Sequence, residues 1–364
     1  MSHITLLLPD LEMGGAQRVM LFLAREFVAH GHHVDLVLLS SSGPLLNDIP
    51  KTVNTVDLAV PNFGLGQLGF LISSVFYLSI WMRKKKPDVI LSTITGANLV
   101  ALLAQKNVSS PRIVIREAVT LKNINNTLRL RAMRWLYPKA DAVISLTNVM
   151  AEELNSKIGV SRTNIHCISN PVDTEFIHQQ AKIPISQRWL NNKEFKVIIS
   201  VGRLIIQKDY ETLLRAFALL PRKLSAYLII IGEGDEKSKL EKLSVELEID
   251  DITLFAGFDS NPWRWMAQAD LFVLSSRWEG QPNALLEALA LGLPAVITNY
   301  DSSAVDIQGK SSVSVVDIGD EKMLAKKIEQ HLLSKKTTCI QEISNNNNNI
   351  IKSYLHALGA RDKQ

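Results

Sequence analysis

The fold is decided by residues 270–298, which read DLFVLSSRWEGQPNALLEALALGLPAVIT. Residues 271–275 and 295–298 are short apolar runs of the kind that form buried strands. Between them, an apolar segment opens at Pro282, a residue favoured in the first turn of a helix, and stops before the Gly-x-Pro of residues 292–294. The stretch therefore predicts a strand, a loop, a helix and a second strand.

Two carboxylates in this stretch indicate a ligand. Glu287 lies in a helix that is apolar nearly all round, where an unsatisfied carboxylate is costly. Glu279 lies in the preceding loop, where open α/β sheets bind ligands and helix amides attract anions. A ligand with hydroxyl groups and phosphates, such as a nucleotide sugar, fits both positions. The alternative is a buried helix with one structural glutamate.

The pattern SxxEGxPxxxxEA at residues 276–288, followed by GxP at 292–294, resembles the donor-site signature of the retaining glycosyltransferases of family 4, which have the GT-B fold. A second match follows the predicted strand 196–201, where Gly-Arg-Leu at 202–204 and Lys208 have the spacing of the family. Two cations at the carboxyl end of a strand can clamp a diphosphate and neutralise a leaving group. The alternative for Arg203 and Lys208 is a solvated pair.

The organisation of the chain agrees with this resemblance, since apolar strands alternate with helical patterns through most of its length. We expect an α/β protein of the GT-B fold, with two doubly wound Rossmann-like domains facing across a cleft. The expected boundaries are 1–175 for an acceptor-side domain and 176–349 for a nucleotide-sugar donor domain. A C-terminal helix within 350–364 is expected to pack back on the first domain. Residues 174–194 lack clear periodicity and are expected to form the linker.

The resemblance also implies site residues. The catalytic residues are expected to be Arg203, Lys208 and Glu279. The expected donor-binding residues are Gly15, Arg203, Lys208, Gly257, Phe258, Glu279, Gly280, Asn283, Ala284 and Glu287. The residues expected on the acceptor side are Gly14, Arg116 and Glu117.

The resemblance implies a mechanism as well. Many family members carry a histidine where this chain has Ala118, so we expect a front-face reaction in which the leaving phosphate takes the acceptor proton. Arg203 and Lys208 are expected to stabilise the departing diphosphate. Glu279 is expected to hold the sugar hydroxyls and Glu287 the ribose. The chain has no Asp-x-Asp, so we expect no metal and no cofactor beyond the nucleotide sugar, which is a co-substrate.

Composition excludes several other classes of protein. At 364 residues, with 46% hydrophobic and 21% charged residues, the chain suits two globular domains. Cys167 and Cys339 are its only cysteines, so neither a disulfide framework nor a thiolate metal site is expected. The longest apolar run, 68–81, contains three serines and is too short to span a membrane. The GLGQLG at 64–69 lacks the context of a dinucleotide site, and the GKS at 309–311 lacks that of a P-loop.

Charge is distributed unevenly along the chain. Between Arg83 and Lys139 there are twelve lysines or arginines against two acidic residues, and this run adjoins the aromatic residues of 70–81. An aromatic helix with a basic end suits an anionic membrane surface, although a core helix with a solvated basic end is equally compatible. We expect a cytoplasmic protein in peripheral contact with the inner face of the plasma membrane. Neither nucleic-acid binding nor more than weak oligomerisation is expected.

Together, these features predict a retaining glycosyltransferase that moves a hexose or N-acetylhexosamine from a UDP-linked or similar donor to a polyprenyl-diphosphate-linked glycan in surface polysaccharide biosynthesis. Two alternatives remain at this point. One is a sugar-nucleotide epimerase on the same fold, and the other is a catalytically inactive protein that binds nucleotide sugars. The sequence does not specify the sugar, the linkage or the acceptor.

Overall fold

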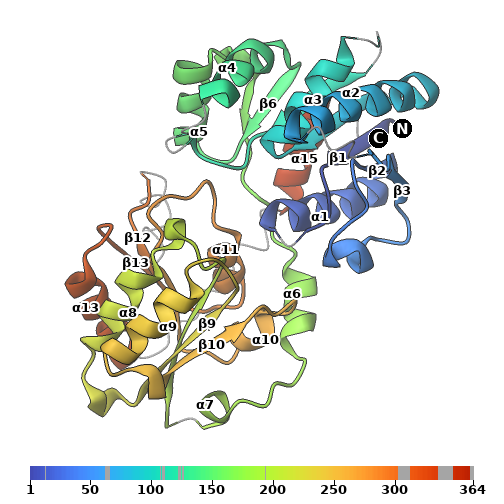
Figure 1. Ribbon diagram of the computed structural model, residues 1–364. Helices are drawn as coiled ribbons and strands as arrows, with labels where there is room; N and C mark the ends of the chain where they lie inside the picture. The colour runs from blue at the N-terminus through green and yellow to red at the C-terminus, as the bar shows by residue number, and fades with distance from the viewer. Residues whose placement is uncertain are drawn as a thin grey trace. The chain divides into compact units, whose positions relative to one another are not determined.

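The computed structural model describes residues 1–12, 14–61, 66–106, 108, 111–121, 124, 127–192, 194–301, 312–334 and 347–360. The chain divides into two compact units (Figure 1). Unit 1 comprises Met1–Pro171 and Asn346–Gln364, and unit 2 comprises Val172–Asn345. Each unit has its own parallel sheet with helices on both faces, so the predicted α/β class is confirmed.

Unit 1 contains a seven-stranded parallel sheet in the order β3-β2-β1-β4-β5-β6-β7. Its strands are β1 (His3–Leu8), β2 (His33–Leu38), β3 (Asn54–Asp57), β4 (Val89–Thr93), β5 (Arg112–Arg116), β6 (Ala142–Ser145) and β7 (Ile165–Cys167). The register pairs successive residues of neighbouring strands, for example His3 with His33 and Leu8 with Leu38. The central strands are buried along almost their whole length, as expected for a sheet that is covered on both faces.

Two helical layers cover this sheet. α1 (Gly15–Ala29) and the C-terminal α15 (Asn347–Leu358) share one core cluster with one face of the sheet. α2 (Gly66–Lys85), α3 (Thr95–Gln105) and α4 (Thr127–Leu136) share the other. α5 (Asn148–Glu153) continues directly into a π-helical turn, Leu154–Ile158. Short 3₁₀ turns are η1 (Pro44–Asp48), η3 (Tyr137–Lys139) and η5 (Arg162–Asn164).

Unit 2 contains a six-stranded parallel sheet in the order β10-β9-β8-β11-β12-β13. Its strands are β8 (Lys196–Val201), β9 (Ala226–Ile231), β10 (Thr253–Gly257), β11 (Leu271–Leu274), β12 (Ala295–Thr298) and β13 (Val313–Val316). On one face pack α6 (Thr174–Ala181), α10 (Trp263–Met266) and α11 (Asn283–Ala290), and on the other pack α8 (Tyr210–Ala218), α9 (Lys237–Glu246) and α13 (Glu321–Leu333). The 3₁₀ turns are η6 (Ile206–Lys208), η7 (Arg222–Leu224) and η8 (Asp250–Ile252).

The stretch 270–298 forms the predicted strand, loop, helix and strand. β11 ends at Leu274, and Pro282 is the N-cap of α11 instead of its first helical residue. The helix ends before Gly292, whose φ of 74° is a left-handed conformation that glycine adopts at low cost. The local punctuation of this segment was therefore sufficient to place its elements within one residue.

The expectation of a linker at 174–194 is wrong, because α6 and the short α7 (Arg188–Asn191) lie there. Asp173 caps α6 by accepting a hydrogen bond from the amide of Phe176 at 3.1 Å. In α7, the ring of Trp189 stacks on that of Tyr227 in β9, with the ring centroids 4.5 Å apart. Such short helices show no sequence period, and it is their packing on the sheet that stabilises them.

Several sequence patterns can be placed only in part. α2 begins at Gly66, inside the GLGQLG pattern, and residues 62–65 lie outside the described part of the chain. The GKS of 309–311 and Cys339 also lie outside it, whereas Cys167 is an exposed free thiol. None of the described helices combines the length and the apolar character needed to cross a membrane.

Candidate active site

The centre of the candidate site is an ion pair between two neighbouring strand ends of unit 2. β8 and β11 are paired in parallel, so the loops that follow them leave the same edge of the sheet. Lys208 comes from the loop after β8 and Glu279 from the loop after β11. The Nζ of Lys208 lies 2.6 Å from Oε1 of Glu279, and only 16% and 8% of these side chains are exposed. The structure thus joins two predicted catalytic residues that are 71 positions apart.

Further hydrogen bonds hold the Glu279 carboxylate in place. The hydroxyl of Ser276 donates to Oε1 at 2.7 Å, and the amide of Gln207 donates to Oε2 at 3.4 Å. The hydroxyl of Ser275 donates to the carbonyl of Lys208 at 2.8 Å, which ties one loop to the other. Sequence reasoning assigned no role to Gln207 or Ser275. Ser276 belongs to the family signature, which is the signal that could have identified it.

A second ion pair lies on the flank of the same two loops. The carboxylate of Asp209 lies 3.0 Å from the Nε of Arg277, and the amide of Arg277 donates to the carbonyl of Gln207 at 2.8 Å. Asp209 adopts a φ of 48°, a left-handed conformation that aspartate tolerates better than most residues. This second pair fixes the turn that presents Lys208.

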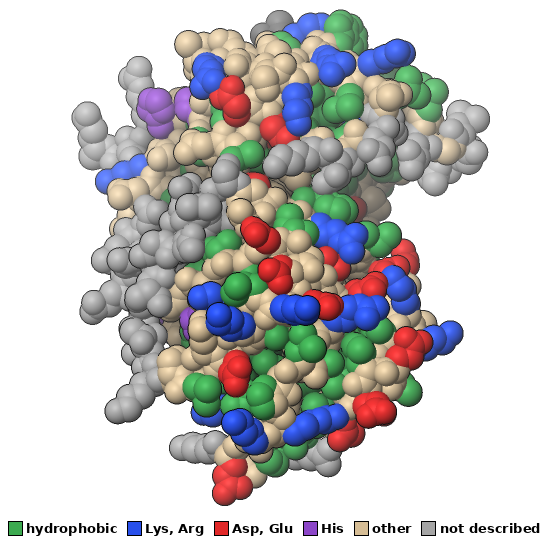
Figure 2. Space-filling model, turned by 90° about the vertical axis from the view of Figure 1, so that its left-hand side faces the viewer, with side chains coloured by type: hydrophobic (Ala, Val, Ile, Leu, Met, Phe, Trp, Pro, Cys, Tyr) green, Lys and Arg blue, Asp and Glu red, His purple; other side chains and the backbone are tan. Residues whose placement is uncertain are grey.

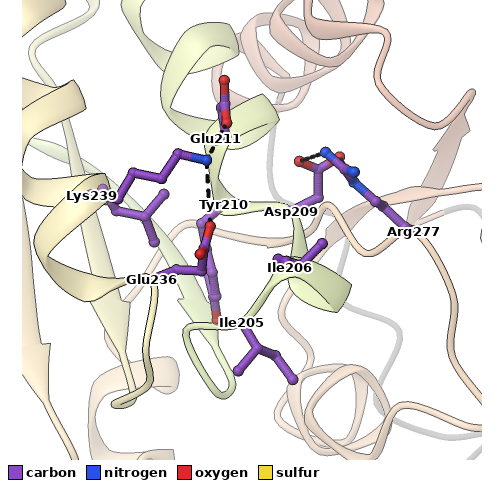
Figure 3. Close-up of a pocket in the computed structure, with 9 residues that line it drawn as sticks. Ile205, Ile206, Asp209, Tyr210, Glu211, Glu236, Lys239 and Arg277 are labelled. Atoms are coloured by element: carbon purple, nitrogen blue, oxygen red, sulfur yellow. Dashed lines mark hydrogen bonds and ion pairs between the residues drawn. The ribbon is translucent and has the colours of Figure 1, made fainter.

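Beside this pair is a cavity of about 220 Å³ between the Lys208 loop and the starts of α8 and α9 (Figure 3). Its charged walls are already paired, Arg277 with Asp209, and Lys239 with both Glu211 and Glu236. None of the predicted catalytic residues is among the residues that line it. We therefore assign it no ligand.

The loop that carries Arg203 is closely packed against its neighbour. A Cβ on Gly232, at a φ of 148°, would lie 2.0 Å from the carbonyl oxygen of Gly202, so only glycine fits there. The amide of Gly232 in turn donates to the carbonyl of Gly257 at 2.8 Å. The Arg203 side chain is exposed, and it has no hydrogen bond or ion pair within the described part of the chain. A cation thus projects from a rigid strand end.

The second glutamate of the signature, Glu287, lies on α11 and is partly buried. Its Oε2 accepts a hydrogen bond from the indole Nε1 of Trp263 on α10 at 3.0 Å. Trp263 is 4% exposed, and its indole would otherwise bury an unsatisfied donor. Nothing local in the sequence connects Trp263 with α11, so only the fold reveals this contact.

The other predicted donor contacts of unit 2 lie at the same edge of this sheet, in loops or at the start of α11. Gly257 ends β10 with a φ of 74°, and Phe258 follows it with 49% of its surface exposed. Gly280 is buried beside Glu279, whereas Asn283 and Ala284 begin α11 and are partly exposed. No hydrogen bond connects Arg203 or Glu287 directly to the Lys208–Glu279 pair among the described residues.

In unit 1, the predicted residues follow β1 and β5. Gly14 is the N-cap of α1 in an extended conformation, and Gly15 is the first residue of that helix. A Cβ on Gly14 would come within 2.3 Å of the Gln17 side-chain oxygen. This is an obstacle that a flexible side chain can relieve, so the backbone tolerates more here than at Gly232.

Arg116 and Glu117 are both completely buried. The guanidinium of Arg116 donates to the side-chain oxygens of Thr93, Asn170 and Tyr354, which joins β4, the end of unit 1 and α15. Arg116, which was predicted on the acceptor side, therefore connects the C-terminal helix α15 to the sheet.

Glu117 accepts hydrogen bonds from the hydroxyl of Tyr137 at 2.6 Å, from Thr95, and from the amides of Ala118 and Val119. Burial raises the pKa of the Glu117 carboxyl, and burial together with the adjacent Glu117 raises the pKa of Tyr137 well above its usual range. Through these contacts Glu117 holds the turn after β5.

The described residues of unit 2 offer no cluster of metal ligands. Among the described residues, no group of three or more histidine, cysteine or carboxylate side chains in unit 2 lies close enough to share an ion. The charges that could face a diphosphate there are those of Arg203 and Lys208.

Comparison with known protein families decides the class of the protein. Residues 13–176 match the family model described as Glycosyltransferase Family 4, and residues 182–350 match the one described as Glycosyl transferases group 1. The chain belongs to glycosyltransferase family 4. The two models together cover nearly all of both units, including every predicted site residue of this glycosyltransferase family member.

Two curated relatives show what this family 4 protein is similar to. One is the N-acetylgalactosamine-N,N'-diacetylbacillosaminyl-diphospho-undecaprenol 4-alpha-N-acetylgalactosaminyltransferase of Campylobacter jejuni, 32% identical over 231 residues. The match covers 62% of this chain and 61% of that protein. The other is the lipopolysaccharide core biosynthesis glycosyltransferase LpsE of Rhizobium meliloti, 31% identical over 195 residues, which are 53% of this chain and 54% of that protein. The chain thus spans little more than half the length of these relatives.

Solved structures establish the fold over the whole chain. Anabaena Alr3699/HepE, crystallised with UDP and glucose, matches with a TM-score of 0.80 at 19% identity and covers 99% of this chain and 100% of that one. WaaG, a glycosyltransferase involved in lipopolysaccharide biosynthesis, matches with a TM-score of 0.69 at 17% identity, over 99% of this chain and 96% of that one. The predicted GT-B fold is therefore confirmed.

Proposed function

We propose that this family 4 protein is a retaining glycosyltransferase that moves a hexose or N-acetylhexosamine from a UDP-sugar to a polyprenyl-diphosphate-linked glycan. It acts at the cytoplasmic face of the membrane without a metal ion. The observation that carries the proposal is the Lys208–Glu279 pair, held at the carboxyl edge of the unit 2 sheet. Arg203 leaves the same edge after β8, and its exposed side chain has no ion pair among the described residues. HepE, solved with UDP and glucose, supports UDP as the nucleotide.

The arrangement suits the departure of a diphosphate. The bond between the sugar C1 and the diphosphate oxygen breaks, and negative charge grows on that oxygen. Lys208 and Arg203 neutralise this charge in place of a divalent ion, which is the kind of electrostatic stabilisation that contributes most to enzymatic rates. Glu279 orients Lys208 by their ion pair. Its second oxygen accepts from the side-chain amide of Gln207 at 3.4 Å and, in the proposed reaction, also accepts from a sugar hydroxyl.

The acceptor completes the reaction on the same face of the sugar. Its hydroxyl oxygen forms the new bond to C1, and its proton passes to the departing diphosphate oxygen. No protein base is then required, which agrees with Ala118 standing where many family members have histidine. Glu287, held by Trp263, accepts from the ribose hydroxyls and anchors the nucleotide.

A transfer assay tests this proposal. Purified protein is incubated with UDP-hexoses and UDP-N-acetylhexosamines and with polyprenyl-diphosphate-linked or free glycans, in the presence of EDTA. We expect transfer to the lipid-linked acceptor with retention at the anomeric carbon and no loss in EDTA. An inverted product, or activity that only Mg²⁺ or Mn²⁺ restores, would contradict the mechanism. Epimerised donor without transfer would instead identify an epimerase.

The acceptor side of the proposal is based on α2. Four of its side chains, spaced four residues apart, form an exposed apolar stripe: Leu68, Ile72, Phe76 and Ile80 are 67%, 63%, 61% and 47% exposed. Spacing of four residues places them along one side of the helix. Trp81, which the sequence grouped with the interfacial aromatics, is instead buried in the core.

The same helix ends in three basic residues, Arg83, Lys84 and Lys85, followed by Lys86. On the face of the molecule that Figure 2 shows, many lysines and arginines lie beside acidic side chains, and α8 and α9 carry ion pairs such as those of Arg215 and Lys239 with Glu211. An apolar stripe beside a run of basic residues suits an anionic bilayer, at about 1 kcal/mol for each cation near the surface. A lipid-linked acceptor resides at such a surface. The name of the Campylobacter relative contains an acceptor of this kind, a diphospho-undecaprenol.

Liposome flotation tests the membrane contact. The wild type is expected to float with anionic vesicles at low salt and to be released by high salt. Changing Arg83, Lys84 and Lys85 to Gln should weaken flotation, and changing Ile72 and Phe76 to Ser should weaken it at any salt concentration. The matched control changes three basic residues of α13, Lys322, Lys326 and Lys327, to Gln and should float as the wild type does. If flotation is lost equally in the two basic triple variants, net charge alone explains it, and α2 has no specific role.

A further inference from the structure

A cluster of three side chains that the proposed reaction does not use lies at the amino-terminal ends of β1 and β2 in unit 1. His3 and His33 are the first residues of β1 and β2 and are partners in the register, and Asp35 follows two residues after His33 on the same face of the sheet. One ligand atom from each of these three side chains lies within 4.8 Å of the others. We propose that His3, His33 and Asp35 bind one divalent transition-metal ion, and that their ligand set suits Zn²⁺.

The charge balance of Asp35 is the first argument. This carboxylate is 1% exposed, and each of its oxygens has one partner: Asn54 Nδ2 at 2.7 Å and His3 Nε2 at 2.8 Å. No lysine or arginine contacts it within the described part of the chain. A buried carboxylate is stable when it is hydrogen-bonded, ion-paired or bound to a metal ion. Either the hydrogen bond to His3 Nε2 or a metal ion between the two side chains can fill this role.

The second imidazole favours the metal ion. A proton shared by His3 and Asp35 needs only these two groups, whereas His33 adds a third nitrogen ligand. The His33 ring meets that of His3 edge-on, with centroids 4.5 Å apart, and it is exposed, so an ion can enter from solvent. Two imidazoles and a carboxylate, with a remaining position for water, form a ligand set typical of zinc.

The geometry requires only small movements. Ligand atoms of a tetrahedral zinc ion with bonds of about 2.0–2.2 Å lie about 3.3 Å apart. The contact between His3 and Asp35 therefore opens by about half an ångström when the ion replaces the shared proton, and the exposed His33 ring turns inward. Asn54 continues to hold the other carboxylate oxygen, as the outer hydrogen-bond partners of metal ligands do.

The position of the cluster determines what the ion does. β1 is six residues long, so His3 lies about 17 Å from the carboxyl end of the strand that leads to Gly14 and Gly15. The ion joins the first residues of β1 and β2 and stabilises unit 1, because it binds the folded chain more tightly than the unfolded one. It takes no part in the transfer reaction.

Zinc titration of metal-free protein without a polyhistidine tag tests this inference. Calorimetry should show one Zn²⁺ per chain, and Zn²⁺ should raise the unfolding temperature. Co²⁺ should give visible absorption bands of a bound ion. His33→Gln, at an exposed position, should weaken Zn²⁺ binding by at least about tenfold and abolish the thermal shift. The control is His178→Gln, which removes an exposed histidine of α6 in unit 2 and should change neither.

The inference is overturned if wild-type protein binds no stoichiometric Zn²⁺, if His33→Gln binds it as tightly as the wild type, or if His178→Gln weakens binding equally. The rate of sugar transfer should be the same in His33→Gln and in EDTA-treated wild type. A loss of transfer that Zn²⁺ restores would place the ion in the reaction and contradict a remote structural site. Because binding and thermal shift are measured without any sugar substrate, this test does not depend on the proposed function.

Discussion

Both units of the glycosyltransferase place predicted site residues after the carboxyl ends of parallel strands, but they use them differently. In unit 2, Lys208 and Glu279 lie in loops, keep part of their surface accessible, and pair with each other. In unit 1, Arg116 and Glu117 come at an equivalent strand end but are sealed inside the fold by hydrogen bonds to Tyr354 and Tyr137. The two strand ends therefore differ in accessibility: part of the Lys208–Glu279 pair faces solvent, whereas Arg116 and Glu117 make their contacts inside the fold.

The largest effect that would sharpen this comparison is on the rate of sugar transfer. Lys208→Ala and Glu279→Ala should each lower kcat by about 10²–10³, because the first removes a cation that stabilises the departing diphosphate and the second removes the carboxylate that orients this cation. The double variant should lose little more than either single one, since the two side chains act as one unit. Transfer kinetics and thermal unfolding measure both claims.

The matched control for these variants is Arg215→Ala, which breaks the exposed ion pair of Arg215 with Glu211 on α8. It should keep nearly wild-type kcat, because exposed pairs contribute little. If Lys208→Ala turns over like this control, the site assignment fails. If its loss of activity follows a loss of folded protein instead, the difference between the two units disappears.

A smaller effect concerns the donor. Trp263→Phe removes the indole N–H that holds Glu287 and keeps an aromatic ring in the core. We expect KM for the UDP-sugar to rise about tenfold with kcat nearly unchanged, as for the loss of one hydrogen bond to a charged group. Trp265→Phe, which removes an equivalent bond to Asp259, is the control and should leave KM unchanged. Equal KM values for the two variants would show that Trp263 only fills space.

The smallest effect belongs to unit 1 and depends on pH. Burial raises the pKa of Glu117, so the folded protein holds this proton more tightly than the unfolded chain does. Its contribution to stability is full below the usual value of 4.5 and is lost as pH rises through the raised pKa. Glu117→Gln cannot ionise and should lack this loss. The free energy of unfolding of the variant, relative to wild type, should therefore increase from pH 4.5 upward.

Each unit by which the pKa is raised corresponds to about 1.4 kcal/mol of this change. Urea unfolding across the pH range measures it, and Glu152→Gln, at an exposed acidic residue of α5, is the control. If the free energies of unfolding of Glu117→Gln and wild type differ by an amount that is constant with pH, the pKa of the Glu117 carboxyl is not raised. If Glu117→Gln is fully folded but has a much lower kcat, Glu117 takes part in the reaction. The two units then do not differ in the use of their strand-end charges.

The sequence alone determined the α/β fold and the strand, loop and helix around Glu279, because glycine, proline and apolar runs act on local conformation. The family resemblance also predicted that Lys208 and Glu279 belong to one site, and the structure brings the two side chains together in an ion pair. Only the tertiary structure showed that Gln207 and Ser276 hold Glu279, that Trp263 holds Glu287, and that residues 174–194 form helices.

The physical reason is that these contacts depend on strand order and on packing between elements. Arg116 meets Tyr354 across 238 positions, and His3 meets Asp35 across 32, because parallel strands and a returning helix bring them together. A sequence period describes which face of one element is apolar, but it does not specify which polar side chain of another element lies opposite. Whether a strand-end charge is accessible or sealed, as in units 2 and 1, is therefore decided by the fold.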